Sequence, residues 1–186
     1  MHIVIPDDYQ DCVRDLDAFA KLAGHHVTIY TDTVSDEDEL VERFQDADAL
    51  VLIRERTPIT ASLLARLPKL KLISQTGGGA AHVDMAACRE HGVVVLAGTG
   101  SPYAAAELTW GLVLSAMRRI PEEVENLKAG RWQRTLGTGL KGRTLGVFGY
   151  GKIGQLVARY GQAFEMNVLV SVSYTHLRAH ETRHDL

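Results

Sequence analysis

Three closely spaced glycines in the second half of the chain have the arrangement that binds a pyrophosphate. They lie in GYGKIG, Gly149 to Gly154, directly after the apolar run Thr144 to Phe148. The first glycine allows a tight turn, and the second lets the backbone approach a phosphate. The third lets the helix pack closely against the strand. The N-terminus of the following helix offers unpaired N–H groups to the anion. These residues therefore predict a dinucleotide-binding turn.

The flanking segments support this interpretation, because a glycine turn alone also occurs for purely structural reasons. Apolar residues recur after the turn at helical spacing: Ile153, Leu156, Val157, Tyr160 and Phe164. Asn167 to Val170 then begins another apolar strand. One expected part is absent, since no Asp or Glu lies between Met166 and His180 to bind the adenosine ribose.

Two acids, Asp7 and Asp8, follow the first predicted strand. Paired acids at this position hold a metal in phosphoryl-accepting receiver domains, which also need an acceptor Asp after the third strand. This chain has Arg54 there. We therefore interpret the two acids as turn and cap residues and predict no metal site.

Two further groups follow the third and fourth predicted strands, where open α/β sheets bind ligands. Arg54 and Arg56 could hold a carboxylate in a fork, or form a solvated charged loop. Gly77, Gly78 and Gly79 could direct N–H groups at an anion, or form a flexible turn. Because the two groups would be neighbours, each makes the other more credible as an anion site.

Other residues are interpreted as structural. His82 is expected to be a hydrogen-bonding residue rather than a general base. In the apolar helix of residues 104–117, Trp110 is expected to pack in a core, and Glu107 to be paired or to face a cleft. The same helix supplies four further predicted core residues: Leu108, Leu112, Leu114 and Met117.

Short apolar strands alternate with helices over residues 1–98. Strands are predicted at residues 2–6, 26–30, 49–53, 70–74 and 93–96, and helices at residues 11–24, 36–44, 60–67 and 84–91. Asp11 is the expected cap of the first helix. This alternation predicts an α/β fold, a flavodoxin-like doubly wound parallel sheet covered on both faces. Ser101 is expected to cap a long helix that ends near residue 120, and a second helix follows to residue 129.

Composition excludes several classes of protein. The 186 residues carry a net charge of −3, so charge implies no nucleic-acid partner. The chain shows no signal peptide, and its longest apolar stretch is interrupted by Glu107 and too short to span a membrane. The two cysteines, Cys12 and Cys88, suit a reducing cytoplasm and are interpreted as buried structural thiols.

With these residues in place, residues 1 to about 170 resemble the N-terminal portion of D-isomer-specific 2-hydroxyacid dehydrogenases. Four motifs carry the resemblance in order: IRERTPIT, LKLISQTGGGAAHVDMAACREHGV, AAELTWGLVLSAMRRI and LKGRTLGVFGYGKIG. The resemblance implies a substrate domain over residues 1–98 and a crossing helix with its connector over 99–142. It also implies the start of a truncated Rossmann NAD-binding domain over 143–170, and a homodimer when full length.

The resemblance also implies roles for residues. The substrate carboxylate, from a small 2-hydroxy or 2-keto acid, is expected near the Arg54–Arg56 loop and the Gly77–Gly79 turn. The expected cofactor contacts are Gly149, Tyr150, Gly151, Lys152, Ile153, Gly154 and Thr109. The implied reaction transfers a hydride between C2 of the acid and NAD, with NADP not excluded. The imidazole, carboxylate and arginine that would catalyse it come from a later region and cannot be assigned here.

Two non-enzymatic interpretations remain open. Some relatives with this fold are corepressors, so the chain could be a dinucleotide-binding module without catalytic activity. It could also be a free-standing flavodoxin-like domain with an unstructured C-terminal appendage, which would have no affinity for NAD.

The resemblance ends after Val170. Residues 171–186 read SVSYTHLRAHETRHDL, with histidines at His176, His180 and His184, and are interpreted as a non-native tail. Before that point the chain departs from the family pattern at Glu165, where glycine is usual. With one complete strand of its nucleotide sheet, the chain is expected to leave four apolar side chains partly exposed: Leu145, Val147, Val168 and Val170.

From this interpretation we expect the 186-residue chain to be an incomplete dehydrogenase with little or no catalytic activity. The measurement is NADH consumption by the purified chain with a 2-keto acid. Clear turnover would show that the chain already holds a complete catalytic set.

Overall fold

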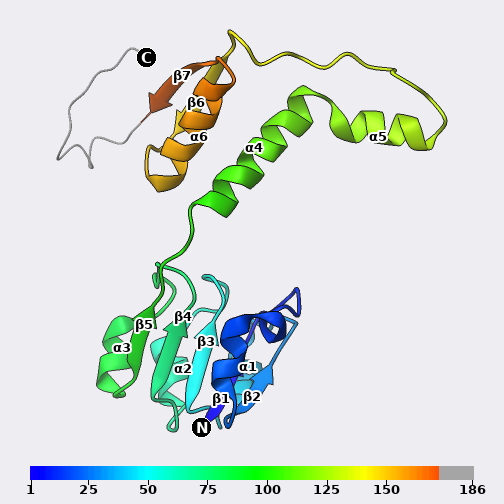
Figure 1. Cartoon of the computed structure of the whole chain (residues 1–186). Coiled ribbons are helices and arrows are strands. Elements are labelled where there is room, and N and C mark those ends of the chain that lie inside the picture. The colour runs from blue at the N-terminus through cyan, green and yellow to red at the C-terminus, as the bar shows by residue number, and fades with distance from the viewer. Residues whose placement is uncertain (172–186) are drawn as a thin grey trace. The chain divides into compact units, whose positions relative to one another are not determined.

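The computed structural model describes residues 1–171, which form parts of two compact units. Unit 1 is Met1–Gly100, and unit 2 begins at Ser101. Figure 1 shows the elements of both units along the chain. The three histidines of the tail, His176, His180 and His184, lie outside the described residues.

Unit 1 is built on a five-stranded parallel sheet with the order β2-β1-β3-β4-β5. The strands are β1 (His2–Ile5), β2 (His26–Ile29), β3 (Ala49–Leu52), β4 (Leu72–Gln75) and β5 (Val94–Ala97). This is the flavodoxin-like strand order. The predicted α/β class and the five strands are confirmed, with boundaries that shift by one or two residues.

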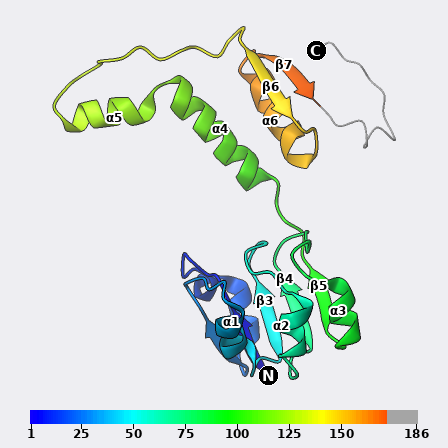
Figure 2. The same cartoon turned by 180° about the vertical axis from the view of Figure 1, so that it is seen from behind.

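Three helices cover one face of this sheet, as Figure 2 shows. They are α1 (Glu37–Phe44), α2 (Ala61–Ala65) and α3 (Met85–Glu90). Their side chains and the sheet enclose the main core, in which Phe44, Leu50 and Ile73 are fully buried. This burial is the main favourable contribution to the stability of the unit.

The opposite face of the sheet is covered only in part. Two short 3₁₀ helices, η1 (Val13–Asp15) and η2 (Asp17–Leu22), lie over Ile3, Ile5 and Ala49 and bury them. On β5, Val94 and Leu96 remain 56% and 57% exposed. The covering of this face is thus confined to the β1 and β3 side of the sheet.

The prediction of a single helix capped by Asp11 is wrong. Leu16 has an extended backbone, with ψ of 133°, and this separates η1 from η2. Asp8, rather than Asp11, accepts hydrogen bonds from the N–H groups that open η1, those of Cys12 (3.2 Å) and Val13 (2.9 Å). Cys12 is exposed, so its interpretation as a buried thiol is also wrong, whereas Cys88 is buried.

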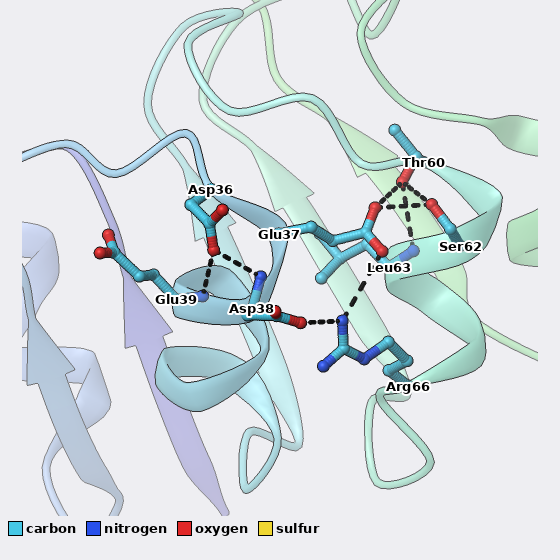
Figure 3. A network of polar contacts seen from close by, with 8 residues as sticks. All are labelled: Asp36, Glu37, Asp38, Glu39, Thr60, Ser62, Leu63 and Arg66. Atoms are coloured by element: carbon cyan, nitrogen blue, oxygen red, sulfur yellow. Dashed lines mark hydrogen bonds and ion pairs between the residues drawn. The ribbon is translucent and has the colours of Figure 1, made fainter.

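A side-chain cap begins each of the helices α1 and α2, and other side chains of the same network link the two helices (Figure 3). Asp36 accepts from the N–H groups of Asp38 (2.9 Å) and Glu39 (3.2 Å), and Thr60 Oγ1 accepts from the N–H of Leu63 (3.1 Å). Each cap satisfies backbone donors that the first turn of a helix leaves unpaired.

Side-chain contacts then connect α1 to α2. Glu37 Oε2 accepts from Ser62 Oγ at 2.6 Å, and Arg66 Nη1 lies 2.7 Å from Asp38 Oδ1. The contact of Ser62 lies at the start of α2 and that of Arg66 at its end, so both ends of the helix contact α1. The start of α2 follows the segment that joins it to β3. That segment includes Arg54 and Arg56.

Unit 2 contains two helices followed by a strand-turn-helix-strand unit. The elements are α4 (Tyr103–Met117), α5 (Ile120–Lys128), β6 (Thr144–Phe148), α6 (Lys152–Ala163) and β7 (Asn167–Ser171). β6 and β7 pair in parallel from Thr144–Asn167 to Phe148–Ser171. The expected sequence of elements around the glycine turn is confirmed, and Ser171 belongs to β7 rather than to the tail.

The start of α4 is partly as expected. Pro102 stands at the N-cap, and Ser101 Oγ accepts from the N–H of Tyr103 at 3.3 Å. The helix ends at Met117, earlier than the expected position near residue 120. No helix within residues 1–171 is long and apolar enough to cross a bilayer.

Unit 2 has its own core, formed where α4 and α6 meet the β6–β7 pair. The Trp110 ring is 8% exposed and lies 5.0 Å from Phe164 and 6.1 Å from Tyr160 between ring centroids. The prediction that Trp110 packs in a core is confirmed. Val147 is also buried, contrary to expectation, because α6 covers its face of the strand pair.

Several of the exposed apolar side chains of unit 2 lie on α4 and on the β6–β7 pair. Leu108 and Leu112 are 65% and 62% exposed, so their prediction as core residues is wrong: α4 is apolar on all sides, and only one side joins the core. Leu114 and Met117 are partly buried. On the strand pair, Val170 (41%) is exposed as expected, and other positions are more so: Leu169 (64%) and Phe148 (90%).

We expect Glu165→Gly to raise the free energy of unfolding of unit 2. Glu165 has φ of 56°, in the left-handed region where a Cβ costs about 1 kcal/mol and glycine is at ease. Its ion pair with Lys141 (2.6 Å) is exposed and contributes little. Urea unfolding followed by Trp fluorescence should show a gain of about 0.5 to 1 kcal/mol.

Glu165→Ala is the matched control, because it removes the ion pair but keeps the strained Cβ. It should be no more stable than the wild type. Equal gains from both variants would mean that the carboxylate, not the backbone, is unfavourable at this position.

Candidate functional site

The parallel pairing of β1, β3 and β4 brings the segments that follow them to one end of the sheet. These segments contain Asp7, the Arg54–Thr57 loop and the Gly77–Gly79 turn. Ligands of open α/β sheets bind beyond this carboxyl end. The residues selected from the sequence are therefore brought together in unit 1.

Arg54 and Arg56 have different environments. Arg54 is exposed, has a left-handed backbone with φ of 59°, and accepts a 2.9 Å hydrogen bond at its carbonyl from Gln75 Nε2. Arg56 is half-buried, donates from Nη1 to the Asp7 carbonyl, and lies 4.0 Å from the Tyr9 ring centroid. Arg56 thus has partners within the protein, whereas the guanidinium of Arg54 faces solvent.

The Gly77–Gly79 turn does not have the alternating backbone of an anion-binding nest, because none of its glycines has a positive φ. Its glycines instead permit close approach. A Cβ on Gly79 would overlap Oε1 of Glu55, and a Cβ on Gly78 would lie 3.5 Å from the Gly98 carbonyl. Sequence reasoning missed Glu55, whose carboxylate lies over the turn.

Asp7 and Asp8 are both buried, each 2% exposed. The interpretation of Asp8 as a cap is confirmed by its bonds to η1. Asp7 is more than a turn residue: Oδ1 accepts from Thr33 Oγ1 at 2.5 Å and Oδ2 from Thr57 Oγ1 at 2.6 Å. Those partners are 26 and 50 residues away, so no local pattern could have indicated them.

Three other expectations have mixed outcomes. The ring nitrogens of His82 are enclosed and have no hydrogen-bond partner in the described part of the chain, so its prediction as a side-chain hydrogen-bonding residue is wrong. Its carbonyl accepts from the N–H of Ile59 at 2.8 Å. Glu107 is exposed and forms no ion pair within residues 1–171. Thr109, an expected cofactor contact, is exposed and donates to the Ala105 carbonyl at 2.8 Å.

In unit 2 the three glycines of the turn differ in the space around them. Gly149 has φ of 91°, which favours glycine. A Cβ on Gly154 would overlap the Gly149 carbonyl oxygen and lie 3.3 Å from Val147 Cγ1. Among residues 1–171 a Cβ on Gly151 would meet nothing within 4 Å, and its φ of −76° suits any residue. Gly149 and Gly154 are therefore required by the protein itself, and Gly151 is not.

The turn presents an open helix N-terminus. Gly151 is the N-cap of α6 and supplies no side-chain cap. The first N–H groups of the helix are thus available to an anion, and the helix dipole favours negative charge there. The residues around it are exposed: Tyr150 (43%), Ile153 (44%) and Lys152. Ile153, expected on the apolar face of the helix, lies outside the core.

The fold of unit 1 and the glycine turn of unit 2 define the class of dinucleotide-binding α/β proteins. The sequence model for the D-isomer specific 2-hydroxyacid dehydrogenase catalytic domain matches residues 4–183. This match extends beyond Val170, where the quoted motifs end. The chain belongs to the D-isomer-specific 2-hydroxyacid dehydrogenase family.

Individual relatives agree with this family. A D-3-phosphoglycerate dehydrogenase of Methanocaldococcus jannaschii is 41% identical over 136 residues, 72% of this chain and 26% of that protein. The crystal structure of a phosphoglycerate oxidoreductase from Vibrio cholerae o395 matches with a TM-score of 0.87 and 55% identity, over 94% of this chain and 57% of that one.

A more distant structure is a D-lactate dehydrogenase from Aquifex aeolicus complexed with NAD and lactic acid. Its TM-score is 0.67 and its identity 29%, over 90% of this chain and 50% of that one. The chain spans between about a quarter and a third of the length of the curated relatives it matches.

We expect part of the acid sensitivity of unit 1 to come from Asp8. Burial alone would raise its pKa, but the N–H groups of Val13 and Cys12 that donate to the carboxylate hold the pKa below its ordinary value. A lowered folded-state pKa stabilises the fold above the unfolded-state pKa, near 4, and this contribution is lost as pH falls through the folded-state pKa.

Asp8→Asn cannot titrate, and it keeps one of the two oxygen acceptors that the Cys12 and Val13 N–H groups use. It is therefore compared with the wild type by its change with pH rather than by its stability at one pH. Urea unfolding at pH 6 and pH 3 should show a smaller loss of stability in this variant than in the wild type. An identical loss in the two proteins would assign the acid sensitivity to other carboxylates.

Proposed function

We propose that this chain contributes a substrate-binding unit and the pyrophosphate-binding turn of an oxidoreductase. The enzyme would act on the CH–OH group of a D-2-hydroxy acid with NAD as hydride acceptor. The observation that carries the proposal is the α6 N-terminus, where Gly151 leaves open space in front of unpaired N–H groups. Family membership supplies the class of reaction.

The cofactor is proposed to lie with its pyrophosphate against the Gly149–Gly154 turn. The N–H groups at the start of α6 would donate to the phosphates, and the Lys152 ammonium would attract their charge. Tyr150, Ile153 and Thr109 are proposed as further contacts. A dinucleotide held by these residues would supply the hydride acceptor for the reaction. NAD is proposed over NADP from the family resemblance, and competition binding of the two would test the choice.

The substrate is proposed to be a small 2-hydroxy or 2-keto acid at the carboxyl end of the unit 1 sheet. Arg54 is the exposed cation there, and it would bind the carboxylate together with main-chain groups of Gly77, Gly78 and Gly79. Arg56 would hold the same loop in place through its hydrogen bond to the Asp7 carbonyl. Lactate and phosphoglycerate, named for relatives, are both 2-hydroxy acids.

We further propose that the full-length protein is a homodimer in the cytoplasm. The apolar exposed surface of α4 at Leu108 and Leu112 supports an interface between two copies, as the family resemblance implies. Cys12 and Cys88 are both free thiols, which suits a reducing compartment.

Gly151→Ala should separate cofactor binding from stability. The new methyl group meets no protein atom within 4 Å, so the melting temperature should stay close to that of the wild type. The methyl would occupy the approach to the pyrophosphate, and calorimetric titration with NAD should show a loss of affinity of about tenfold or more.

Gly154→Ala is the contrasting variant, because its methyl overlaps the Gly149 carbonyl. It should destabilise unit 2 by about 1 to 3 kcal/mol. Absence of NAD binding by the wild-type chain, or equal affinity in Gly151→Ala, would remove the support that the turn gives to the proposed function.

A further inference from the structure

The Arg54–Thr57 loop is hydrogen-bonded to side chains at the ends of two other strands, β4 and β1. Gln75, at the end of β4, is 2% exposed and donates to the Arg54 carbonyl at 2.9 Å. Asp7, after β1, is also 2% exposed and accepts from the Thr57 hydroxyl at 2.6 Å. The loop that carries the exposed arginine is thus fixed near both its ends.

Asp7 accepts three hydrogen bonds from side chains of other segments at this end of the sheet. Its carboxylate joins the Thr57 hydroxyl after β3 to the Thr33 hydroxyl after β2, at 2.6 and 2.5 Å. Its carbonyl accepts from Arg56 Nη1. The residue therefore connects the segments that follow three neighbouring strands, β2, β1 and β3.

The backbone conformations of Asp7 and Arg54 also indicate that contacts hold both residues in place. Asp7 and Arg54 both have left-handed backbones, with φ of 64° and 59°. Such conformations are unfavourable for residues with a Cβ and persist where surrounding contacts impose them. At Asp7 those contacts are the hydrogen bonds to Thr57, Thr33 and Arg56.

The same contacts assign different tasks to the two arginines. Arg56 is engaged by the Asp7 carbonyl and by the face of the Tyr9 ring, 4.0 Å away. Arg54, two residues earlier, is exposed. A loop fixed through Asp7 therefore points one guanidinium into the protein and the other to solvent.

We infer that Asp7 is a positioning residue, which through Thr57 and Arg56 sets the loop so that Arg54 presents its guanidinium to the carboxylate of a 2-keto or 2-hydroxy acid. This inference rests on the proposed function for its ligand. Asp7 itself is buried and would not touch the ligand. Its effect on binding is transmitted by the hydroxyl of Thr57.

The pair Thr57→Val and Thr33→Val tests the inference, because each removes one hydroxyl from the same carboxylate and nearly preserves volume. The Thr33 hydroxyl also contacts the Tyr9 hydroxyl, so Tyr9→Phe is the control for that second contact. Pyruvate is the probe, titrated into the full 186-residue chain while the amide shifts of Gly77–Gly79 are followed by NMR. Thr57→Val should weaken binding roughly three- to tenfold, the range expected for one hydrogen bond. Thr33→Val should leave binding unchanged. Because Thr57 is buried and Thr33 exposed, the affinities are compared at a temperature at which every variant is folded.

Thr57→Ser restores the hydroxyl and should restore the affinity for pyruvate. Arg54→Gln provides a thermodynamic cycle: once Arg54 is replaced, Thr57→Val should have little further effect. Additive losses, or equal losses in the Thr57 and Thr33 variants, would reduce Asp7 to a structural residue and overturn the inference.

Hydrogen exchange at the buried side-chain amide of Gln75, which donates to the Arg54 carbonyl at 2.9 Å, gives a second readout without any ligand. Exchange should accelerate in Thr57→Val and in Asp7→Asn but not in Thr33→Val. If the wild-type chain does not bind pyruvate, the proposed ligand fails while this comparison still decides the role of Asp7. Equal exchange in all variants would overturn that role.

Discussion

The parallel pairing of β1 with β3 and of β3 with β4 is the constraint on which the rest of unit 1 depends. Parallel strands end on the same side, so segments separated by dozens of residues meet at the carboxyl end of the sheet. Burial of Leu50 and Ile73 between the sheet and its helices holds this register. The core brings the site residues to one end of the sheet, and hydrogen bonds such as that between Asp7 and Thr57 then fix the loops that carry them.

At this end of the sheet the carboxylates of Asp7 and Asp8 are buried, whereas Arg54 is exposed. A buried carboxylate needs donors, and Asp7 has two hydroxyls while Asp8 has two backbone N–H groups. Because those acids are satisfied internally, their charges do not pair with Arg54. That arginine is left exposed at the site proposed for the substrate carboxylate.

The glycines of unit 2 show how one residue type meets three physical demands. A positive φ requires Gly149, and contact with a carbonyl oxygen requires Gly154. Gly151 meets neither demand within the described residues, and the proposed contact with a pyrophosphate would supply a third. At Glu165 the opposite occurs, since a left-handed position carries a side chain.

By itself the sequence determined the α/β class, the strand-turn-helix-strand unit and the glycine turn, because hydrophobic period and glycine spacing are local properties. It also placed Arg54 and Gly77–Gly79 after neighbouring strands. Tertiary structure alone decided which faces are buried, so Leu108 became exposed and Val147 buried. It alone joined Asp7 to Thr57, because a hydrogen bond between residues 50 positions apart depends on strand order and leaves no local pattern.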